Sequence, residues 1–306
     1  MNITNFKKVM IFNRAFDMVS NELSEYNSYI QKQNGVIEFN PLINFRKELF
    51  VNSSSIIKLR LDLIKEEITE LCDAINQNDI IEQRDACADI LYVVYGMADV
   101  LGISIDDLFS NKFKTNIINN FKSEFGFESG IDNFTYVKTF VNEYIGFDIK
   151  TKNILEMTDI VKHKLNTIYL ELETNCNKVF SNEDSTNTKQ IPKYSPTNIL
   201  NENKADYISH NLYELLVWTY IMTLVLNVNA NDDFSIVHES NMSKLCDNEE
   251  DAKNTIEDYK KKYIAGTSPY DSPYYYYLPN LDKWIVKNLS SGKALKNIKY
   301  KKVCFI

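Results

Sequence analysis

The sequence predicts an all-α fold: a helical bundle that is internally duplicated, with a degenerate second copy, and that ends in a small C-terminal β-hairpin. Gly and Pro number only 8 and 6 among 306 residues, well under half of their usual share of about 12%, which is too few for a turn-dense sandwich or barrel. Neither G-x-G-x-x-G nor G-x-x-x-x-G-K-[ST] occurs, which excludes a nucleotide fold built on a Gly-rich loop. Apolar residues instead recur at steps of three and four, the period of an amphipathic helix.

The first third of the chain contains most of the expected helices. In order, we expect an amphipathic helix at about 6–16, a polar helix at 21–33, a loop with Pro41, a long amphipathic helix at 56–75, a polar break at 76–79, an apolar helix at 80–101 and a short helix after Asp106. The serines at 53–55 suit the N-terminal cap of the long helix, and Gly102 ends the apolar one. Because the helix at 80–101 is apolar around most of its circumference, we expect it to be buried in the middle of the bundle.

The remainder of the chain changes character twice. The polar segment 177–204 contains Pro192 and Pro196 and predicts a long loop. The apolar stretch 215–228 is too short to span a bilayer, so we expect a buried helix there. Four consecutive tyrosines, a run at 284–287, a Ser-Ser-Gly turn at 290–292 and the segment 300–305 then predict a small two-stranded hairpin.

An internal repeat is indicated by an offset of 125 residues, which aligns segment 89–119 with 214–244 without a gap. At this offset Tyr95 meets Tyr220 and Phe109 meets Phe234, and a shift of 128 aligns 5–12 with 133–140. The register extends beyond one buried stripe, which favours duplication over chance similarity between amphipathic helices. We therefore expect three parts: a catalytic repeat at 1–126, a degenerate repeat at 127–247, and a C-terminal helix and hairpin at 248–306.

Charge and cysteine content narrow the possible partners. A formal charge of −8 argues against a nucleic-acid-binding domain, because such domains are usually basic. The five cysteines form no C-x-x-C pair, so we expect neither a disulfide framework nor a structural zinc site, and a reducing compartment is the default. The first twelve residues lack the apolar run of a signal peptide. We expect a cytoplasmic protein with no membrane or nucleic-acid partner.

Two acidic runs carry the expected chemistry. Glu67 and Glu70 share one face of the helix at 56–75, and Glu82, Asp85 and Asp89 share one face of the next helix, because residues three or four apart lie on one side of a helix. A short connection makes the two helices antiparallel neighbours, so these faces are expected to meet inside the bundle. Converging carboxylates repel one another unless a hard divalent cation, Mg²⁺ or Mn²⁺, neutralises them. Two ordinary solvated faces are the alternative interpretation.

These runs resemble a known family. The pattern E-E-x-x-E-L, then E-x-x-D-A-x-A-D-I-L-Y-V-V-Y-G and L-G-I, is similar to the all-α nucleoside triphosphate pyrophosphohydrolases, in particular the MazG-like and phosphoribosyl-ATP pyrophosphohydrolase-like proteins. Segment 237–245 resembles the V-H-x-S-N-M-S-K-L signature of that branch, and 292–300 resembles its terminal G-K-x-L-K-x-x-x-Y segment. The resemblance covers about 1–120 and 230–306.

The resemblance implies a Mg²⁺-dependent hydrolysis of an NTP, between the α- and β-phosphates, to NMP and diphosphate. It implies that Glu66 orients or deprotonates the attacking water. The implied metal ligands are Glu67, Glu70, Glu82 and Asp85. The implied substrate-binding residues are Asn241 and Lys244, followed by Lys296, Tyr300 and Asp89. A substrate of phosphoribosyl-ATP type, or a nucleotide-binding or assembly module without turnover, remains the alternative function.

The sequence departs from the family in the position of its S-N-M-S-K segment, which stands roughly 120 residues beyond its usual place. At the offset of the repeat, Glu82 falls on Tyr207 and Asp85 falls on His210, while Lys244 falls on Asn119. The first copy therefore keeps the carboxylates and the second keeps the lysine. Because members of the family assemble sites between subunits, we expect either a composite site in a pseudo-dimer within one chain, or a homo-oligomer; a second copy that is only a scaffold is the alternative.

Overall fold

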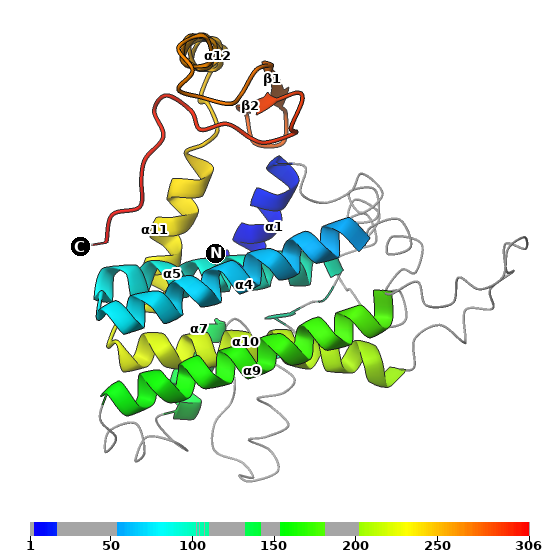
Figure 1. The fold of residues 1–306 in the computed structure, drawn as a ribbon, viewed down its shortest axis with the longest axis vertical. Helices are drawn as coiled ribbons and strands as arrows, with labels where there is room; N and C mark the ends of the chain where they lie inside the picture. The colour runs from blue at the N-terminus through cyan, green and yellow to red at the C-terminus, as the bar shows by residue number, and fades with distance from the viewer. Residues whose placement is uncertain are drawn as a thin grey trace, which may run out of the picture.

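A computed structural model describes residues 3–16, 54–101, 103, 105, 106, 108, 109, 132–141, 154–180 and 202–305. Within these residues the protein is an all-α bundle with one small antiparallel sheet. The bundle has two layers of paired long helices (Figure 1). One layer contains α4 (Ser54–Gln77) and α5 (Ile80–Leu101), and the other contains α9 (Ile154–Phe180) and α10 (Glu202–Val225).

Shorter elements surround this bundle. Helices α1 (Asn5–Ala15) and α11 (Ala230–Met242) both pack on α5, and α7 (Asn133–Phe140) packs on α10. Beyond α11, the helix α12 (Glu249–Ile264) and the strands β1 (Pro273–Leu278) and β2 (Lys283–Asn288) form a separate small lobe, seen at one end of the molecule in Figure 1. The strands pair antiparallel, with Tyr275 opposite Val286.

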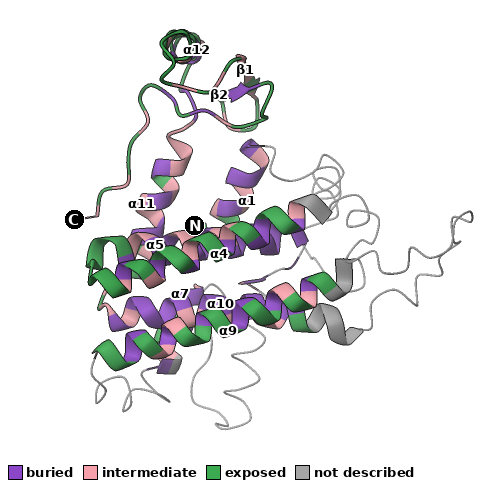
Figure 2. Cartoon of the chain, viewed as in Figure 1, coloured by how far each residue is buried: buried purple, intermediate pink, exposed green. Residues whose placement is uncertain are grey.

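Helix α5 is the centre of the first layer. Its apolar residues are buried along almost its whole length, as Figure 2 shows by the purple colour of the inner helices. The turn before it is tight because Asn78 adopts a positive φ of 55°, a conformation that Asn tolerates better than most residues. Asp79 Oδ1 then accepts the backbone N–H groups of Ile81 and Glu82 and caps α5. This turn makes α4 and α5 antiparallel neighbours.

Helix α10 ends in the same way as α4. Asn227 has a φ of 56°, and the next helix, α11, is capped by Asn229, whose side chain accepts the N–H of Asn231. Both turns therefore use Asn in the left-handed conformation where glycine is the commoner choice. This agrees with the low glycine content of the chain.

The two layers meet at a pair of buried tyrosines. The hydroxyl groups of Tyr95 on α5 and Tyr220 on α10 are hydrogen-bonded at 2.7 Å. Phe6 lies 5.9 Å from the Tyr95 ring, and Phe134 lies 5.7 Å from the Tyr220 ring. Across the layers, Phe234 contacts Tyr95 at 6.0 Å and Phe109 contacts Tyr220 at 6.4 Å, both edge to face.

Polar contacts around these rings come in matching pairs as well. Asn133 Nδ2 donates to Tyr95 Oη at 2.9 Å, while Asn5 hydrogen-bonds Tyr220. Asn133 also donates to Asp106, and Asn5 donates to Asn231. Each contact in one layer thus has a counterpart about 125 to 128 residues away in sequence, as a twofold axis through the tyrosine pair would arrange them.

The expected helices at 6–16, 56–75 and 80–101 are confirmed as α1, α4 and α5, and the buried helix at 215–228 is the second half of α10. The short helix expected after Asp106 is described only in part: Ile105, Asp106, Leu108 and Phe109 are helical. The predicted loop at 177–204 is wrong at both ends, because α9 continues to Phe180 and α10 already begins at Glu202. The predicted polar helix at 21–33, the loop at Pro41, Ser53 and Gly102 lie outside the described residues.

The hairpin is confirmed, but its strands are the tyrosine run and Lys283–Asn288, and the segment 300–305 is an extended tail without strand pairing. Within the described part of the chain, no single helix is long and apolar enough to cross a membrane. Helices α10 and α11 reach that length and composition only when they are joined across a bend of 109°.

Candidate functional site

The acidic residues lie where α4 and α5 run side by side. Ile64, Ile68 and Leu71 are buried and hold α4 against the core, which leaves the flanking Glu67 and Glu70 on the edge of the same contact. Glu67, Asp85 and Asp89 are partly buried, whereas Glu66, Glu70 and Glu82 are exposed. The carboxylates therefore gather at a rim that solvent can reach, and not inside the bundle as the sequence indicated.

These carboxylates are close enough to alter one another's protonation. Burial, followed by the charges of Asp89, Glu70, Glu66 and Asp85, raises the pKa of Glu67 to about 8. Burial and the charges of Asp85 and Glu70, opposed by the charge of Lys244, raise the pKa of Asp89 to about 7. Both shifts come first from burial and then from repulsion between the carboxylates, which a nearby positive charge would relieve.

Asp85 has a buried carboxylate oxygen that no protein donor reaches. Its Oδ1 atom is buried and accepts no hydrogen bond, and burial with the charges of Glu82, Glu70 and Asp233 raises the pKa of its carboxyl. A buried oxygen without a donor is unusual, and oxygen ligands are what Mg²⁺ and Mn²⁺ prefer. In chemistry and charge, the residues present fit a hard divalent cation.

The carboxylates of the rim do not form a closed set of ligands. Among the described residues, no group of three or more His, Cys, Asp or Glu side chains is arranged to hold a metal ion. The assignment of Glu67, Glu70, Glu82 and Asp85 as ligands, and of Glu66 as the residue that acts on water, therefore stays a prediction.

A cationic group comes from the other end of the sequence. Helix α11 packs on α5. Asn241 lies in the last turn of α11 and Lys244 follows its C-cap, with Lys244 Nζ donating to Asn241 Oδ1 at 2.6 Å. Burial and the neighbouring charges of Lys296 and Lys293 lower the pKa of Lys244, while the charge of Asp89 raises it. The packing thus brings Lys244 into electrostatic contact with both the acidic rim and two lysines of the tail.

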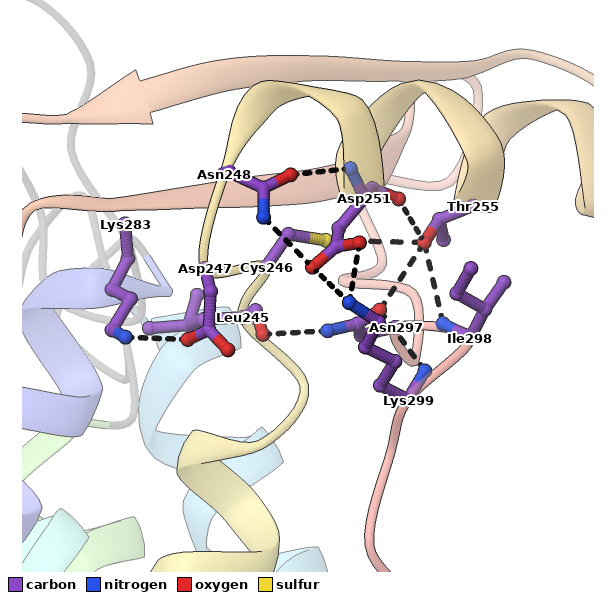
Figure 3. Close-up of polar contacts among 10 residues, drawn as sticks. All are labelled: Leu245, Cys246, Asp247, Asn248, Asp251, Thr255, Lys283, Asn297, Ile298 and Lys299. Atoms are coloured by element: carbon purple, nitrogen blue, oxygen red, sulfur yellow. Dashed lines mark hydrogen bonds and ion pairs between the residues drawn. The ribbon is translucent and has the colours of Figure 1, made fainter.

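The tail is held in this place by a polar network in the small lobe. Figure 3 shows Asn297 donating to the carbonyl of Leu245 (2.9 Å), and Lys299 donating to Asp251 (2.8 Å). Asp251 sits in the first turn of α12, and its own backbone N–H is capped by Asn248. These contacts tie the segment that contains Lys293 and Lys296 to the loop directly after Lys244.

Tyr300 belongs to the same attachment. Ser240 Oγ donates to the carbonyl of Lys301 at 2.8 Å and lies 3.0 Å from Tyr300 Oη, whose hydroxyl can donate to it. Lys296 Nζ lies 4.6 Å from the centre of the Tyr300 ring. The predicted substrate-binding residues Asn241, Lys244, Lys296 and Tyr300 are therefore neighbours. Lys293 and Lys296 are exposed and accessible to an anion.

Three residues of this region were not predicted from the sequence. Arg84 donates twice to Asp233, at 3.0 and 2.7 Å, and ties α5 to α11. Tyr92 hydrogen-bonds Asn241, and its position three residues after Asp89, on the same helix face, was an available signal. Lys293 is the first lysine of the G-K-x-L-K segment, so the pattern that indicated Lys296 could also have indicated Lys293. The role of Arg84 depends on tertiary packing and had no such signal in the sequence.

The whole arrangement has one negative and one positive side. Carboxylates from α4 and α5 line the first, and lysines from the end of α11 and the tail line the second. The charges of such a site are complementary to those of a complex between a divalent cation and a polyphosphate, since carboxylates bind the cation and ammonium groups bind phosphate oxygens.

Comparison with known proteins agrees with this chemistry. The family model for phosphoribosyl-ATP pyrophosphohydrolase matches residues 36–115, the part of the chain that includes α4 and α5. The chain is also 30% identical, over 298 residues, to the uncharacterized protein L479 of Acanthamoeba polyphaga mimivirus, a match that covers 97% of this chain and 92% of that protein. No solved structure matches the chain significantly. The matched domain supports a pyrophosphohydrolase-type activity on phosphoric anhydride bonds.

Proposed function

We propose, from the premise that this chain belongs to the all-α NTP pyrophosphohydrolase superfamily, that it is a Mg²⁺-dependent nucleoside triphosphate pyrophosphohydrolase. It would convert a (d)NTP and water into (d)NMP and diphosphate, a reaction suited to cleaning the nucleotide pool. The observation that carries this proposal is the packing of α11 on α5, which brings Lys244, directly after α11, within electrostatic range of Asp89 in the acidic rim.

The site is composite in this proposal. The layer formed by α4 and α5 supplies the carboxylates, and the segment after the second layer supplies Asn241 and Lys244. We take the two layers to be copies of one unit joined in a pseudo-dimer, and the paired contacts around Tyr95 and Tyr220 support this. Because each copy has lost what the other keeps, neither would be active alone.

The cation would be held by Glu67, Glu70, Glu82 and Asp85. When bound, it supplies charge neutralisation at the phosphate oxygens and lowers the pKa of a water molecule. The buried, unpartnered Oδ1 of Asp85 and the raised pKa of Glu67 support this ligand set.

The other residues act on the substrate directly. Lys244, Lys296 and Lys293 would bind the oxygens of the β- and γ-phosphates through charge-assisted hydrogen bonds, which strengthen as negative charge moves onto the departing diphosphate. Asn241 would donate to a phosphate oxygen beside Lys244. Glu66, exposed at the rim, is free to accept a proton from the attacking water.

The test is a screen of NTPs and dNTPs with Mg²⁺, followed by chromatography of the products. Attack at the α-phosphorus releases NMP and diphosphate, and in ¹⁸O-labelled water the label enters the NMP. Release of NDP and orthophosphate as first products would refute the proposed reaction. Omission of Mg²⁺, with EDTA present, is expected to stop turnover.

Phosphoribosyl-ATP is the second candidate substrate, because the family model that matches residues 36–115 is named for it. Including it in the same screen decides between the two. A protein that binds nucleotides but releases no product from either substrate would be a binding module.

A further inference from the structure

A continuous chain of hydrogen bonds runs from α11 to α5 and back, and it ends at the lysine of the proposed phosphate site. Its members are His238, Tyr92, Asn241 and Lys244. Tyr92 Oη lies 3.0 Å from His238 Nδ1, Tyr92 hydrogen-bonds Asn241, and Lys244 Nζ donates to Asn241 Oδ1 at 2.6 Å. Neither Tyr92 nor His238 was predicted to belong to the site.

The direction of every bond follows from the lysine. An ammonium group only donates, so the Asn241 atom that faces it must be the amide oxygen. The other end of this side chain is then an NH₂ group, which also only donates, so Tyr92 Oη must accept from it. Burial and the charge of Asp89 raise the pKa of Tyr92, and the hydrogen bond with Asn241 opposes this rise, as a donor to the phenol oxygen does.

The single proton of Tyr92 must then go to the remaining neighbour. That neighbour is His238 Nδ1, which can accept only if it carries no hydrogen, so the proton of a neutral imidazole is on Nε2. The surroundings favour the neutral ring, since burial and the charge of Lys8 lower the pKa of His238 to about 4. At neutral pH all four groups therefore have one consistent orientation.

Packing holds the chain in register. Tyr92 is buried, stacks on Phe234 with 5.3 Å between ring centres, and meets Phe12 edge to face at 5.3 Å. The His238 ring is also stacked on Tyr92, at 6.0 Å and an interplanar angle of 29°. Lys244 lies 5.7 Å from the centre of the Phe12 ring, so one aromatic cluster supports both ends of the chain.

We propose that His238 is a positioning residue of the phosphate site: as the neutral Nε2–H tautomer it accepts the proton of Tyr92 and thereby fixes the orientation of Asn241 and the position of Lys244. His238 does not touch the substrate and transfers no proton. The proposal rests on the proposed function in one respect, namely that Lys244 and Asn241 bind phosphate.

The tautomer is tested directly by nitrogen NMR on the whole protein with ¹⁵N-labelled histidine. The chain has only three histidines, His163, His210 and His238, so spectra of His163→Asn and His238→Asn assign the signals. At pH 7 we expect His238 to show a protonated Nε2 and an unprotonated Nδ1. A protonated Nδ1, or a charged ring at this pH, would overturn the proposal.

The positioning role is tested by the binding of inorganic diphosphate, with Mg²⁺, measured by calorimetry. Tyr92→Phe keeps the ring and removes the hydroxyl, and His238→Leu removes the acceptor. Each is expected to weaken diphosphate binding by about 5- to 10-fold, the value of one hydrogen bond. In His238→Asn the amide oxygen replaces Nδ1 as the acceptor, so its affinity should stay within about 2-fold of wild type.

Wild-type affinity in both Tyr92→Phe and His238→Leu, or no diphosphate binding by the wild type, would overturn the role of the chain. Its failure differs from a failure of the proposed function. If the protein shows the expected tautomer and binds diphosphate but cleaves no nucleotide, the proposed hydrolysis is refuted and the hydrogen-bond chain stands. If it cleaves NTP while His238 Nδ1 is protonated, the hydrogen-bond chain is refuted and the proposed hydrolysis stands.

Discussion

The two helical layers pack alike and differ in what they present to solvent. At the offset of 125 residues, Asp85, Asp89 and Tyr92 of α5 correspond to His210, Glu214 and Val217 of α10. On α10, His210 and Glu214 lie 3.5 Å apart and contact each other within the helix. The core positions in both layers are still aromatic and buried, as Tyr95 and Tyr220 are.

The helices α4 and α9, the second long helix of each layer, also differ in the residues at the compared positions. The acidic pair Glu67 and Glu70 of α4 has its counterpart near Thr167 and Leu170 of α9. Thr167 donates to a carbonyl of its own helix, and Leu170 is 59% exposed. The comparison teaches that packing between layers and site chemistry are separable: the second layer keeps its partner surface, while the positions of the predicted metal ligands Glu67, Glu70 and Asp85 no longer hold carboxylates.

The largest expected effect on activity comes from removing one carboxylate charge of the acidic rim, the feature that distinguishes the first layer from the second. Glu67→Gln or Asp85→Asn should lower kcat/KM by at least about 100-fold, because a metal-bound carboxylate supports several kcal/mol of transition-state stabilisation. Without divalent cations, the free energy of unfolding of either variant should equal or exceed that of wild type, since repulsion between carboxylates is relieved. Full activity of either variant at saturating Mg²⁺ would contradict the metal assignment.

Glu257→Gln is the matched control, because this exposed residue lies on α12, away from the rim. Its kcat/KM should equal that of wild type. Addition of Mg²⁺ should raise the melting temperature of wild type and of this control, and raise it less in Glu67→Gln.

A smaller effect tests what the two layers share. Tyr95→Phe and Tyr220→Phe each remove one side of the central hydrogen bond, and each should destabilise the protein by about 1–2 kcal/mol. Twofold symmetry predicts similar costs for the two single variants. The double variant should cost less than their sum, because both lose the same bond. Additive or very unequal costs in urea unfolding would speak against symmetric layers.

The smallest effect concerns pH. The pKa of His238 falls to about 4 in the folded protein, below its value of about 6.5 in the unfolded chain. As the pH drops from 6.5 towards 4, the unfolded chain takes up a proton that the folded protein does not, so stability falls. The whole difference between these two pKa values corresponds to a loss of about 2 kcal/mol in the free energy of unfolding at pH 5. Because the ring is partly exposed, solvent screening reduces this loss to about 1 kcal/mol.

The variant His238→Asn should lack this part of the acid destabilisation. Urea unfolding at pH 7 and pH 5 measures it, and His163→Asn, on an exposed ring of α9, is the control that should behave as wild type. Equal losses of stability in wild type and His238→Asn would contradict the depressed pKa.

Helical periodicity predicted most of the described fold. The expected bounds 80–101 coincide with those of α5, because its apolar run starts after a polar turn and has no competing local signal. The loop predicted at 177–204 was too long at both ends, because α9 continues to Phe180 and α10 begins at Glu202. Polar residues such as Asn and Lys occur both in loops and at the ends of long helices, so composition alone did not locate these two boundaries.

The identities of the candidate site residues could be predicted from the sequence, but their arrangement in space and their exposure could be predicted only in part. The spacing of Glu67 and Glu70 indicated a shared face, and the S-N-M-S-K segment indicated Asn241 and Lys244. The exposure of Glu66, Glu70 and Glu82 depends on how deeply α4 sits against α5, which the period of a single helix does not determine. The role of Tyr92 depends on the packing of α11 on α5, between residues 146 positions apart.

The central claim is that carboxylates of the first layer and the lysine that follows the second layer form one site. The most direct measurement is kcat/KM for the dNTP that the screen identifies, in wild type, Lys244→Ala and Lys261→Ala. Lys261 is an exposed lysine of α12 and serves as the control. We expect Lys244→Ala to lose about 2–4 kcal/mol of transition-state stabilisation, the size of a single charge-stabilising donor, with kcat reduced, and Lys261→Ala to match wild type. A wild-type kcat/KM in Lys244→Ala would contradict the shared site.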